Sequence, residues 1–172
     1  MKKYSVPKNF KSSVGHNNLD NYQSLRENAK QDSNFYWESV ANRIDWFDKW
    51  TTVNNTDYSK AHIEWFSNGK LNASYNCIDR HIENGLGEKT ALIWQSNDPT
   101  ISKNVTYNEL LEKVSLFANG LKRAGIKKGD RVCIYMQMIP EAIVAMLACA
   151  RIGAVHSAVS YTHLRAHETT SD

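Results

Sequence analysis

Apolar residues follow a helical period in the first part of the chain. Residues 1–20 are mostly polar and show no period, so we expect a mobile polar tail there. Between Asn21 and Trp50 the pattern becomes helical, and Ser33 is placed to cap a helix. One apolar face of that helix would carry Tyr36, Val40 and Ile44.

Further along, strand-like runs and helical patterns alternate. A helical segment begins at Asn72 and ends at Gly85. Residues 90–94 form a short apolar run typical of a strand, and a second short segment follows at 104–105. Residues 106–109, Thr-Tyr-Asn-Glu, are a capping box that opens a helix. We expect that helix to bury one stripe, made of Leu110, Val114, Phe117 and Leu121.

The last part of the pattern predicts parallel strands. Residues 131–136 lack polar alternation, which is typical of a strand covered on both faces. Pro140 begins an alanine-rich helix that Gly153 ends, and another strand begins at residue 154. The order strand–helix–strand–helix–strand, with short turns, predicts a parallel, doubly wound sheet of the α/β class.

The pattern therefore predicts two parts. Residues 21–79 form a helical, aromatic-rich lead-in, and residues 80–157 form the opening β-α-β-α-β of an α/β domain. The lead-in contains four of the five tryptophans: Trp37, Trp46, Trp50 and Trp65. Their helical spacing favours packing of the rings against a larger body, and a stacking platform for sugars or bases is the alternative.

Composition and charge point to a soluble globular protein. Hydrophobic residues make up 41% of the chain and charged residues 23%, and the net charge is +3. The basic residues gather in one place, a predicted helix end followed by a turn: Lys122, Arg123, Lys127, Lys128 and Arg131. Cations there oppose the helix dipole, so we interpret the cluster as a solvated turn. The basic excess is too small to indicate nucleic-acid binding.

The cysteines and the apolar runs indicate a cytoplasmic protein. Cys77, Cys133 and Cys149 follow no CxxC spacing, and their odd number argues against a disulfide framework. No apolar run follows the Met-Lys-Lys start, and the longest run, residues 142–150, is far shorter than the ~20 residues of a membrane span. We expect a reducing cytoplasm and no membrane partner; the oligomeric state stays open.

Residues 45–50, 65–81 and 139–157 contain the most distinctive motifs of the chain. These motifs resemble the acetyl-CoA synthetases, the AMP-forming acetate–CoA ligases of the adenylate-forming superfamily. The motifs in residues 45–50 and 65–81 are specific to acetyl and propionyl CoA ligases. Residues 139–157 match a core segment of the acetyl-CoA synthetases nearly residue for residue. Within the matching region, residues 106–110 and 150–157 resemble two core motifs shared across the superfamily.

The resemblance implies a ligase that uses ATP, CoA and Mg²⁺. Acetate would attack the α-phosphate of Mg·ATP to give acetyl-adenylate and pyrophosphate, and the CoA thiol would then displace AMP. In the family, the phosphate-gripping loop, the nucleotide motifs, the acetate pocket and the catalytic lysine all lie beyond Ser157. We therefore expect an N-terminal fragment holding an incomplete large N-terminal domain. Such a fragment would contain no catalytic, cofactor-binding or metal residue and would be inactive alone.

Two alternatives stay open: a fragment of a propionyl-CoA synthetase, and a non-catalytic interaction domain that is complete as it stands. Cys77 and His81 lie four residues apart on one predicted helix, but no second ligand pair completes a zinc site. His156 and Ser157 are adjacent on a predicted strand, so they face opposite sides and make a poor base–nucleophile pair. The remaining candidates have structural explanations: Glu109 and Glu141 as first-turn helix charges, and residues 85–87 and 125–129 as single turns.

The family pattern stops at Ser157. The family continues there with Val-Val-Phe-Gly-Gly-Phe, whereas residues 158–172 match no helix, strand or family pattern. These residues match the translation of a transposase sequencing adapter in one frame. We interpret residues 158–172 as a non-native tail without tertiary contacts. A natural divergent C-terminus is the alternative.

Overall fold

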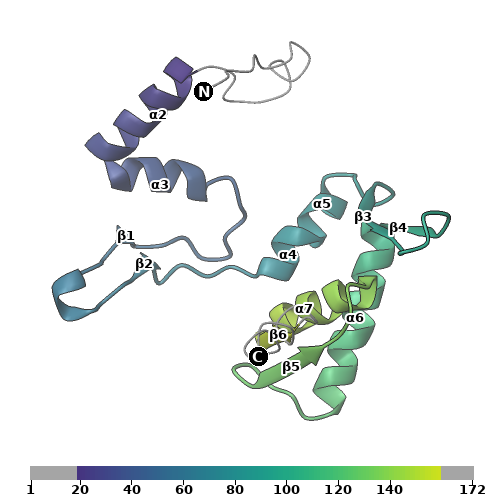
Figure 1. Cartoon of the computed structure of the whole chain (residues 1–172). Helices are drawn as coiled ribbons and strands as arrows, with labels where there is room; N and C mark the ends of the chain where they lie inside the picture. Colours follow the sequence, from purple (N-terminus) through teal and green to yellow (C-terminus); the bar gives the residue numbers. More distant parts are fainter. Residues whose placement is uncertain (1–18, 160–172) are drawn as a thin grey trace, which may run out of the picture. The chain divides into compact units, whose positions relative to one another are not determined.

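The computed structural model describes residues 19–159, and Figure 1 shows their helices and strands. The elements, in chain order, are α2 (Leu19–Gln31), α3 (Ser33–Ala41), β1 (Thr52–Asn54), the 3-10 helix η1 (Tyr58–Lys60), β2 (Trp65–Ser67), α4 (Ala73–Cys77), α5 (Asp79–Glu83), β3 (Thr90–Gln95), β4 (Ser102–Thr106), α6 (Tyr107–Arg123), β5 (Arg131–Tyr135), α7 (Pro140–Ile152) and β6 (Val155–Val159). Residues 1–18 of the expected tail lie outside the described residues, and its last two residues belong to α2.

The described residues form two compact units. The first consists of residues 19–44 and 48–69, and the second of residues 45–47 and 70–159. Helix α4 therefore belongs to the second unit, although the sequence assigns it to the lead-in. The sequence pattern predicts a boundary between the lead-in and the α/β domain at residues 79/80, whereas the second compact unit includes residues from 70 onward.

The first unit contains two helices and an antiparallel strand pair. Strands β1 and β2 pair with Thr52 opposite Ser67. Helix α3 is capped by Asp32, whose carboxylate accepts a hydrogen bond from the Phe35 N–H at 2.9 Å. The prediction of Ser33 as the cap is wrong by one residue, because both side chains are good caps and only backbone geometry separates them. The helical pattern to Trp50 is also wrong, since α3 ends at Ala41.

The tryptophan rings of the first unit pack against other aromatic rings. Trp37 and Trp65 meet edge to face with centroids 5.8 Å apart, and Trp50 meets Phe66 at 5.1 Å. The sequence analysis expected the rings to pack against a larger body, whereas these rings pack against one another. The rings are not fully buried, because Trp37 is 42% exposed and Trp65 is 37% exposed.

The second unit contains an antiparallel pair and a parallel pair of strands. β3 pairs antiparallel with β4, which corrects the expectation that all strands join one parallel sheet. A short loop connects these two strands, and a short loop permits only the antiparallel arrangement. β5 and β6 pair in parallel, with Arg131 opposite Val155, and α7 forms the crossover between them. This β–α–β unit confirms the α/β class.

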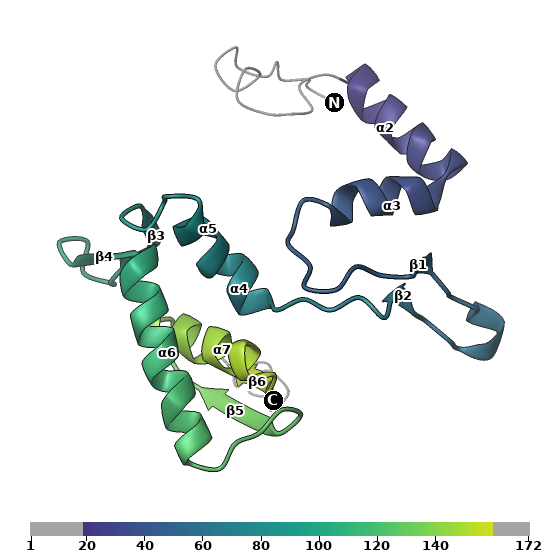
Figure 2. The same ribbon diagram turned by 180° about the vertical axis from the view of Figure 1, so that it is seen from behind.

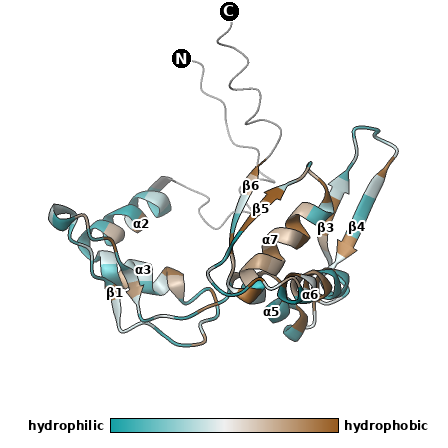
Figure 3. Cartoon of the chain, turned by 90° about the horizontal axis from the view of Figure 1, so that it is seen from below, coloured by the Kyte–Doolittle hydropathy of each residue, from teal (hydrophilic) through white to brown (hydrophobic). Residues whose placement is uncertain are grey.

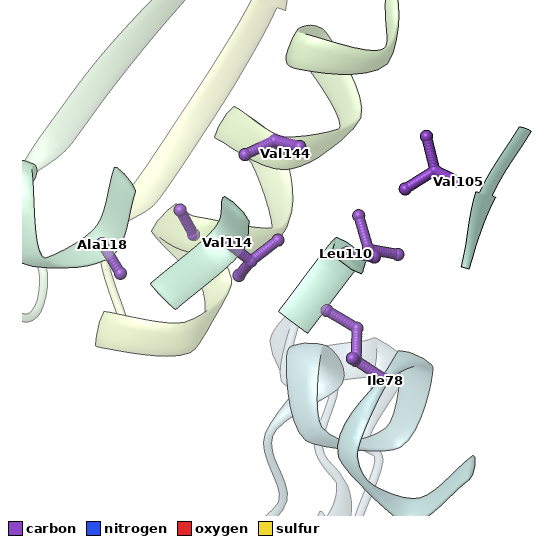
Figure 4. Close-up of a cluster of buried hydrophobic side chains, with 7 residues drawn as sticks. Ile78, Val105, Leu110, Val114, Ala118 and Val144 are labelled. Atoms are coloured by element: carbon purple, nitrogen blue, oxygen red, sulfur yellow. The ribbon is translucent and has the colours of Figure 1, made fainter. Parts of the chain in front are cut away.

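A core of buried side chains joins α5, β4, α6 and α7. Figure 4 shows the residues that meet there, and the cluster consists of Ile78, Val105, Leu110, Val114, Ala118, Val144 and Ala148. Phe117, expected on the buried stripe of α6, is 43% exposed, and Ala118 takes the buried position instead. The true stripe repeats at every fourth residue, because α7 packs beside α6 along that line (Figure 2).

The parallel pair is buried on one face. Along β5, Ile134 is 5% exposed while its neighbour Tyr135 is 69% exposed, so the expectation of cover on both faces is wrong for the described residues. Helix α7 covers one face and buries four of its own side chains: Val144, Ala145, Ala148 and Cys149. Figure 3 shows the apolar character of β5 and α7. Val155 on β6 is 56% exposed, so apolar surface remains uncovered in this part of the chain.

Strand β6 continues past the expected end of the family pattern. Ala158 pairs with Ile134 and Val159 pairs with Tyr135. These two residues therefore have a backbone partner, contrary to the expectation that the tail from Ala158 lacks contacts. Residues 160–172 lie outside the described residues, and the origin of the tail stays a prediction.

Candidate functional site

The amide of Asn72 caps two helices at once. Its Oδ1 accepts hydrogen bonds from the N–H groups of Ser74 at 2.9 Å and Tyr75 at 3.2 Å, which begin α4. Its Nδ2 donates to the carbonyls of Ala150 at 3.1 Å and Arg151 at 3.2 Å, at the C-terminal end of α7. Helix ends leave such groups without internal partners, so one side chain satisfies both ends.

Arg151 and Asp79 form a two-pronged ion pair beside this amide. Nη1 and Nη2 of Arg151 each donate to one carboxylate oxygen of Asp79, both at 2.8 Å. The side chains are 28% and 18% exposed, so water screens the pair incompletely. The hydrogen bonds that Arg151 donates to Asp79 raise the pKa of Arg151 above its ordinary value. We call Asn72, Asp79 and Arg151 the polar clasp, because they fasten α4 and α5 to the end of α7.

A second amide, that of Asn76, holds residues 45–47 in the second unit. Its Oδ1 accepts from the Asp45 N–H at 2.8 Å, and its Nδ2 donates to the Asp45 carbonyl at 2.9 Å. The ring of Phe47 then meets that of Tyr75 with centroids 5.2 Å apart. The Tyr75 hydroxyl donates to Glu83 at 2.6 Å, and this hydrogen bond raises the pKa of Tyr75 to about 12.

Cys77 and His81 do not share a helix. The backbone breaks at Ile78, with φ −128° and ψ −69°, so Cys77 ends α4 while His81 lies in α5. The His81 ring lies against the Tyr107 ring, with centroids 4.9 Å apart. Residues 19–159 contain no group of three or more His, Cys, Asp or Glu side chains arranged to hold a metal ion. We therefore assign no metal site within this range.

The other candidate residues occupy structural positions. Glu109 completes the predicted capping box, accepting from the Thr106 N–H at 2.9 Å. Glu141 lies in the first turn of α7, as expected. His156 and Ser157 are exposed neighbours on β6, opposite Val132 and Cys133 of β5.

The cysteines and the predicted turns add no reactive group. All three cysteines are free thiols, and burial raises the pKa of Cys149, which keeps that thiol protonated. Gly85, Gly125 and Gly129 have positive φ angles, as tight turns require. No helix within residues 19–159 is both long and apolar enough to cross a membrane.

Sequence reasoning did not identify the polar clasp. The residues that its hydrogen bonds connect are separated by between 72 and 79 positions in the sequence. Hydrophobic periodicity indicates only neighbours that are close in sequence. The visible signal was limited to Asn72 at the start of a helix. Chemically, the clasp binds helix ends to each other, and both oxygens of its one carboxylate, Asp79, are engaged by Arg151.

Two family matches divide the chain close to the clasp. Residues 22–77 match the acetyl-coenzyme A synthetase N-terminus, and residues 79–170 match the AMP-binding enzyme family. The clasp spans both segments, since Asn72 lies in the first and Arg151 in the second. The second match extends beyond Ser157 into the tail interpreted as non-native.

Curated relatives share this similarity over most of the chain. Acetyl-coenzyme A synthetase of Magnetococcus marinus is 54% identical over 143 residues, covering 83% of this chain and 22% of the relative. That of Halorhodospira halophila is 48% identical over 159 residues, covering 92% and 24%. That of Agrobacterium fabrum is 50% identical over 153 residues, covering 87% and 23%. The chain thus spans less than a quarter of the length of these relatives.

Proposed function

The chain belongs to the AMP-binding enzyme family, and from this we propose that it forms part of an acetate–CoA ligase. The reaction would convert acetate, CoA and ATP to acetyl-CoA, AMP and pyrophosphate through acetyl-adenylate. One observation carries the proposal: the 54% identity to a named acetyl-coenzyme A synthetase extends over 143 residues, more than either matched segment alone contains.

We propose that this chain has a structural role in the ligase and not a chemical one. Adenylate formation requires backbone donors, a cation clamp and a metal ion around the phosphates. Among residues 19–159, no group of three or more His, Cys, Asp or Glu side chains is arranged to hold a metal ion, and Gly85, Gly125 and Gly129 lie in separate turns. We therefore assign no chemical step to residues 19–159.

In this structural role, the lead-in supports the parallel strand pair of β5 and β6. The clasp connects α4 and α5 to the end of α7, immediately before β6 begins at Val155. Active sites in open α/β sheets gather beyond the carboxyl ends of such strands. Because β6 directly follows α7, a clasp that fixes the end of α7 also fixes where β6 begins and the direction in which it runs.

We further propose acetate as the preferred acid and the cytoplasm as the compartment. The similarity of residues 139–157 to a core segment of the acetyl-CoA synthetases supports acetate over propionate. The three free thiols support a reducing compartment.

A chimera tests the proposal. Residues 22–157 replace the matching segment of the Magnetococcus marinus relative, and acetate-dependent pyrophosphate release is measured. We expect acetate-dependent activity. A chimera that folds, by a cooperative melt matching that of the parent, but releases no pyrophosphate would refute the proposal. The substrate is tested on the completed natural gene, where a higher kcat/KM for propionate than for acetate would refute acetate alone.

A further inference from the structure

Four basic side chains surround one cavity at the C-terminal ends of α6 and α7. The cavity has a volume of about 630 Å³, in the range of small-molecule sites. Its polar lining consists of Ser115, Asn119, Lys122, Lys127, Lys128 and Arg151. No acidic residue lines it, although the whole chain has 18 acidic residues against 21 basic ones. The sequence pattern indicated only a solvated turn at these lysines.

The helix period and a tight turn place these donors together. Ser115, Asn119 and Lys122 lie three or four residues apart on α6, so they share one face beside the buried Ala118. The following loop adds Lys127 and Lys128. A Cβ at Gly153 would lie 2.9 Å from Cγ of Lys128, so the stem of this lysine packs against the turn that ends α7.

Within the described part of the chain, no carboxylate balances the charges of Lys122, Lys127 and Lys128. Arg151 is neutralised by Asp79. Lys122, Lys127 and Lys128 have no carboxylate within 4.0 Å among residues 19–159. The nearby Asp130 carboxylate accepts instead from the backbone N–H of Lys127, at 2.7 Å. Helix dipoles favour cations at these helix ends, but that effect does not explain a cavity lined by four basic side chains and no carboxylate of the described residues.

We propose that this cavity binds a small phosphate-type anion. The three ammonium groups pair with its oxygens, and the Ser115 hydroxyl and the Asn119 amide donate further hydrogen bonds. Lysine is suited to this role as a compact charge with three donors. The site is independent of the proposed function, since residues 19–159 are assigned no chemical step there.

Calorimetric titration of the 172-residue chain with pyrophosphate tests the site. The double variant K127Q/K128Q removes two cavity charges, and K89Q/K103Q removes two exposed lysines outside the cavity. Both variants have the same net charge. We expect K127Q/K128Q to weaken pyrophosphate binding at least about tenfold, as expected for lost charge-assisted hydrogen bonds, and K89Q/K103Q to change it less than about twofold.

Equal effects of the two variants, or no binding to the parent chain, would overturn the site, since either result shows only general charge attraction. A parallel titration with AMP distinguishes two sources of the same phosphate chemistry. Tighter binding of pyrophosphate identifies a free inorganic anion. Tighter binding of AMP, abolished in K127Q/K128Q, identifies a nucleotide whose base contacts the apolar lining at Ile126 and Ile152.

Discussion

The ion pair of Arg151 and Asp79 illustrates how partial burial increases the contribution of an ion pair to stability. Exposed pairs contribute little, because water and salt screen them and two long side chains must be ordered. Here both carboxylate oxygens are engaged at 2.8 Å, and Asp79 is 18% exposed. The planar guanidinium matches the carboxylate, which lysine at the same position would not reproduce.

Replacing Arg151 by Met should lower the free energy of unfolding by about 1–2 kcal/mol, because the partly buried carboxylate loses its donors. The exposed pair of Lys60 with Asp57, 79% and 42% exposed, provides the control. K60M should change stability by less than about 0.5 kcal/mol. Urea unfolding followed by circular dichroism measures both. Equal losses in the two variants would contradict the assigned role of the clasp.

Tyr75 should give the second unit a specific sensitivity to alkali. Its neutral hydroxyl donates to the Glu83 carboxylate, and ionisation would place two negative charges together, so its pKa rises from 10.0 to about 12. In the unfolded chain the phenol ionises at the ordinary value. The stabilisation is therefore fully present below pH 10 and is lost as the pH rises from 10 to about 12.

Tyrosinate absorbance during an alkaline titration checks this prediction. The parent chain should show a phenol ionising near pH 12, and Y75F should lack that transition. Replacing Glu83 by Gln removes the charge but keeps an acceptor, so the pKa of Tyr75 should fall towards its ordinary value. An unchanged titration in both variants would exclude the Tyr75–Glu83 interaction.

Among the elements, those defined by local signals could be predicted from the sequence. The capping box at Thr106 and Glu109 begins α6, and Pro140 and Gly153 bound α7, as expected. The antiparallel pairing of β3 with β4 was missed although the short loop between them already excludes a parallel pair. Local patterns also missed the break at Ile78, whose side chain is fully buried in the core rather than on a continuous helix face.

Two variants of Asn72 separate its cap of α4 from its hydrogen bonds to the end of α7. Asn72→Asp keeps the acceptor that caps α4 but loses the donor and places a negative charge at the end of α7. We expect a loss of about 1–2 kcal/mol for this variant. Asn72→Ala removes both functions and should cost more, measured by the same urea unfolding. If N72D were as stable as the parent chain, the hydrogen bonds to α7 would have no energetic role.

At the scale of the whole molecule, uncovered apolar surface dominates the expected behaviour. The outer face of β5 exposes Tyr135, and β6 exposes Val155, whereas parallel strands are normally covered on both faces. The sequence predicted the apolar strands but not which face would be covered, since that depends on layers packed from elsewhere. The sequence likewise contained the residues of the clasp and of the lysine cavity, but it did not indicate that they lie close together in the fold.

We predict that the 172-residue chain alone is catalytically inert, only marginally stable and prone to aggregate. Acetate-dependent pyrophosphate release should equal the blank, because the chain spans less than a quarter of the length of its ligase relatives. Its thermal melt should have a low midpoint. Turnover above the blank would show that essential site residues lie in this chain after all, and a midpoint as high as that of a stable domain would contradict the marginal stability.

The tail gives a prediction of its own. A chimera that carries residues 158–170 in place of the relative's own segment should lose ligase activity, while the chimera joined after Ser157 keeps it. Equal activity of the two would favour a natural C-terminus over adapter. Overlapping reads of the source DNA past Ser157 provide an independent check.

The Asn72 hydrogen bonds also set an order of events during protein synthesis. The Nδ2 of Asn72 and its acceptor at Ala150 are 78 positions apart, so the link between the start of α4 and the end of α7 cannot form until α7 has left the ribosome. At translation rates of about 5–20 residues per second, this delay is roughly 4–16 s. The Oδ1 cap of α4 is local and needs no part of α7, so during that interval α4 can be capped but is not yet attached to α7.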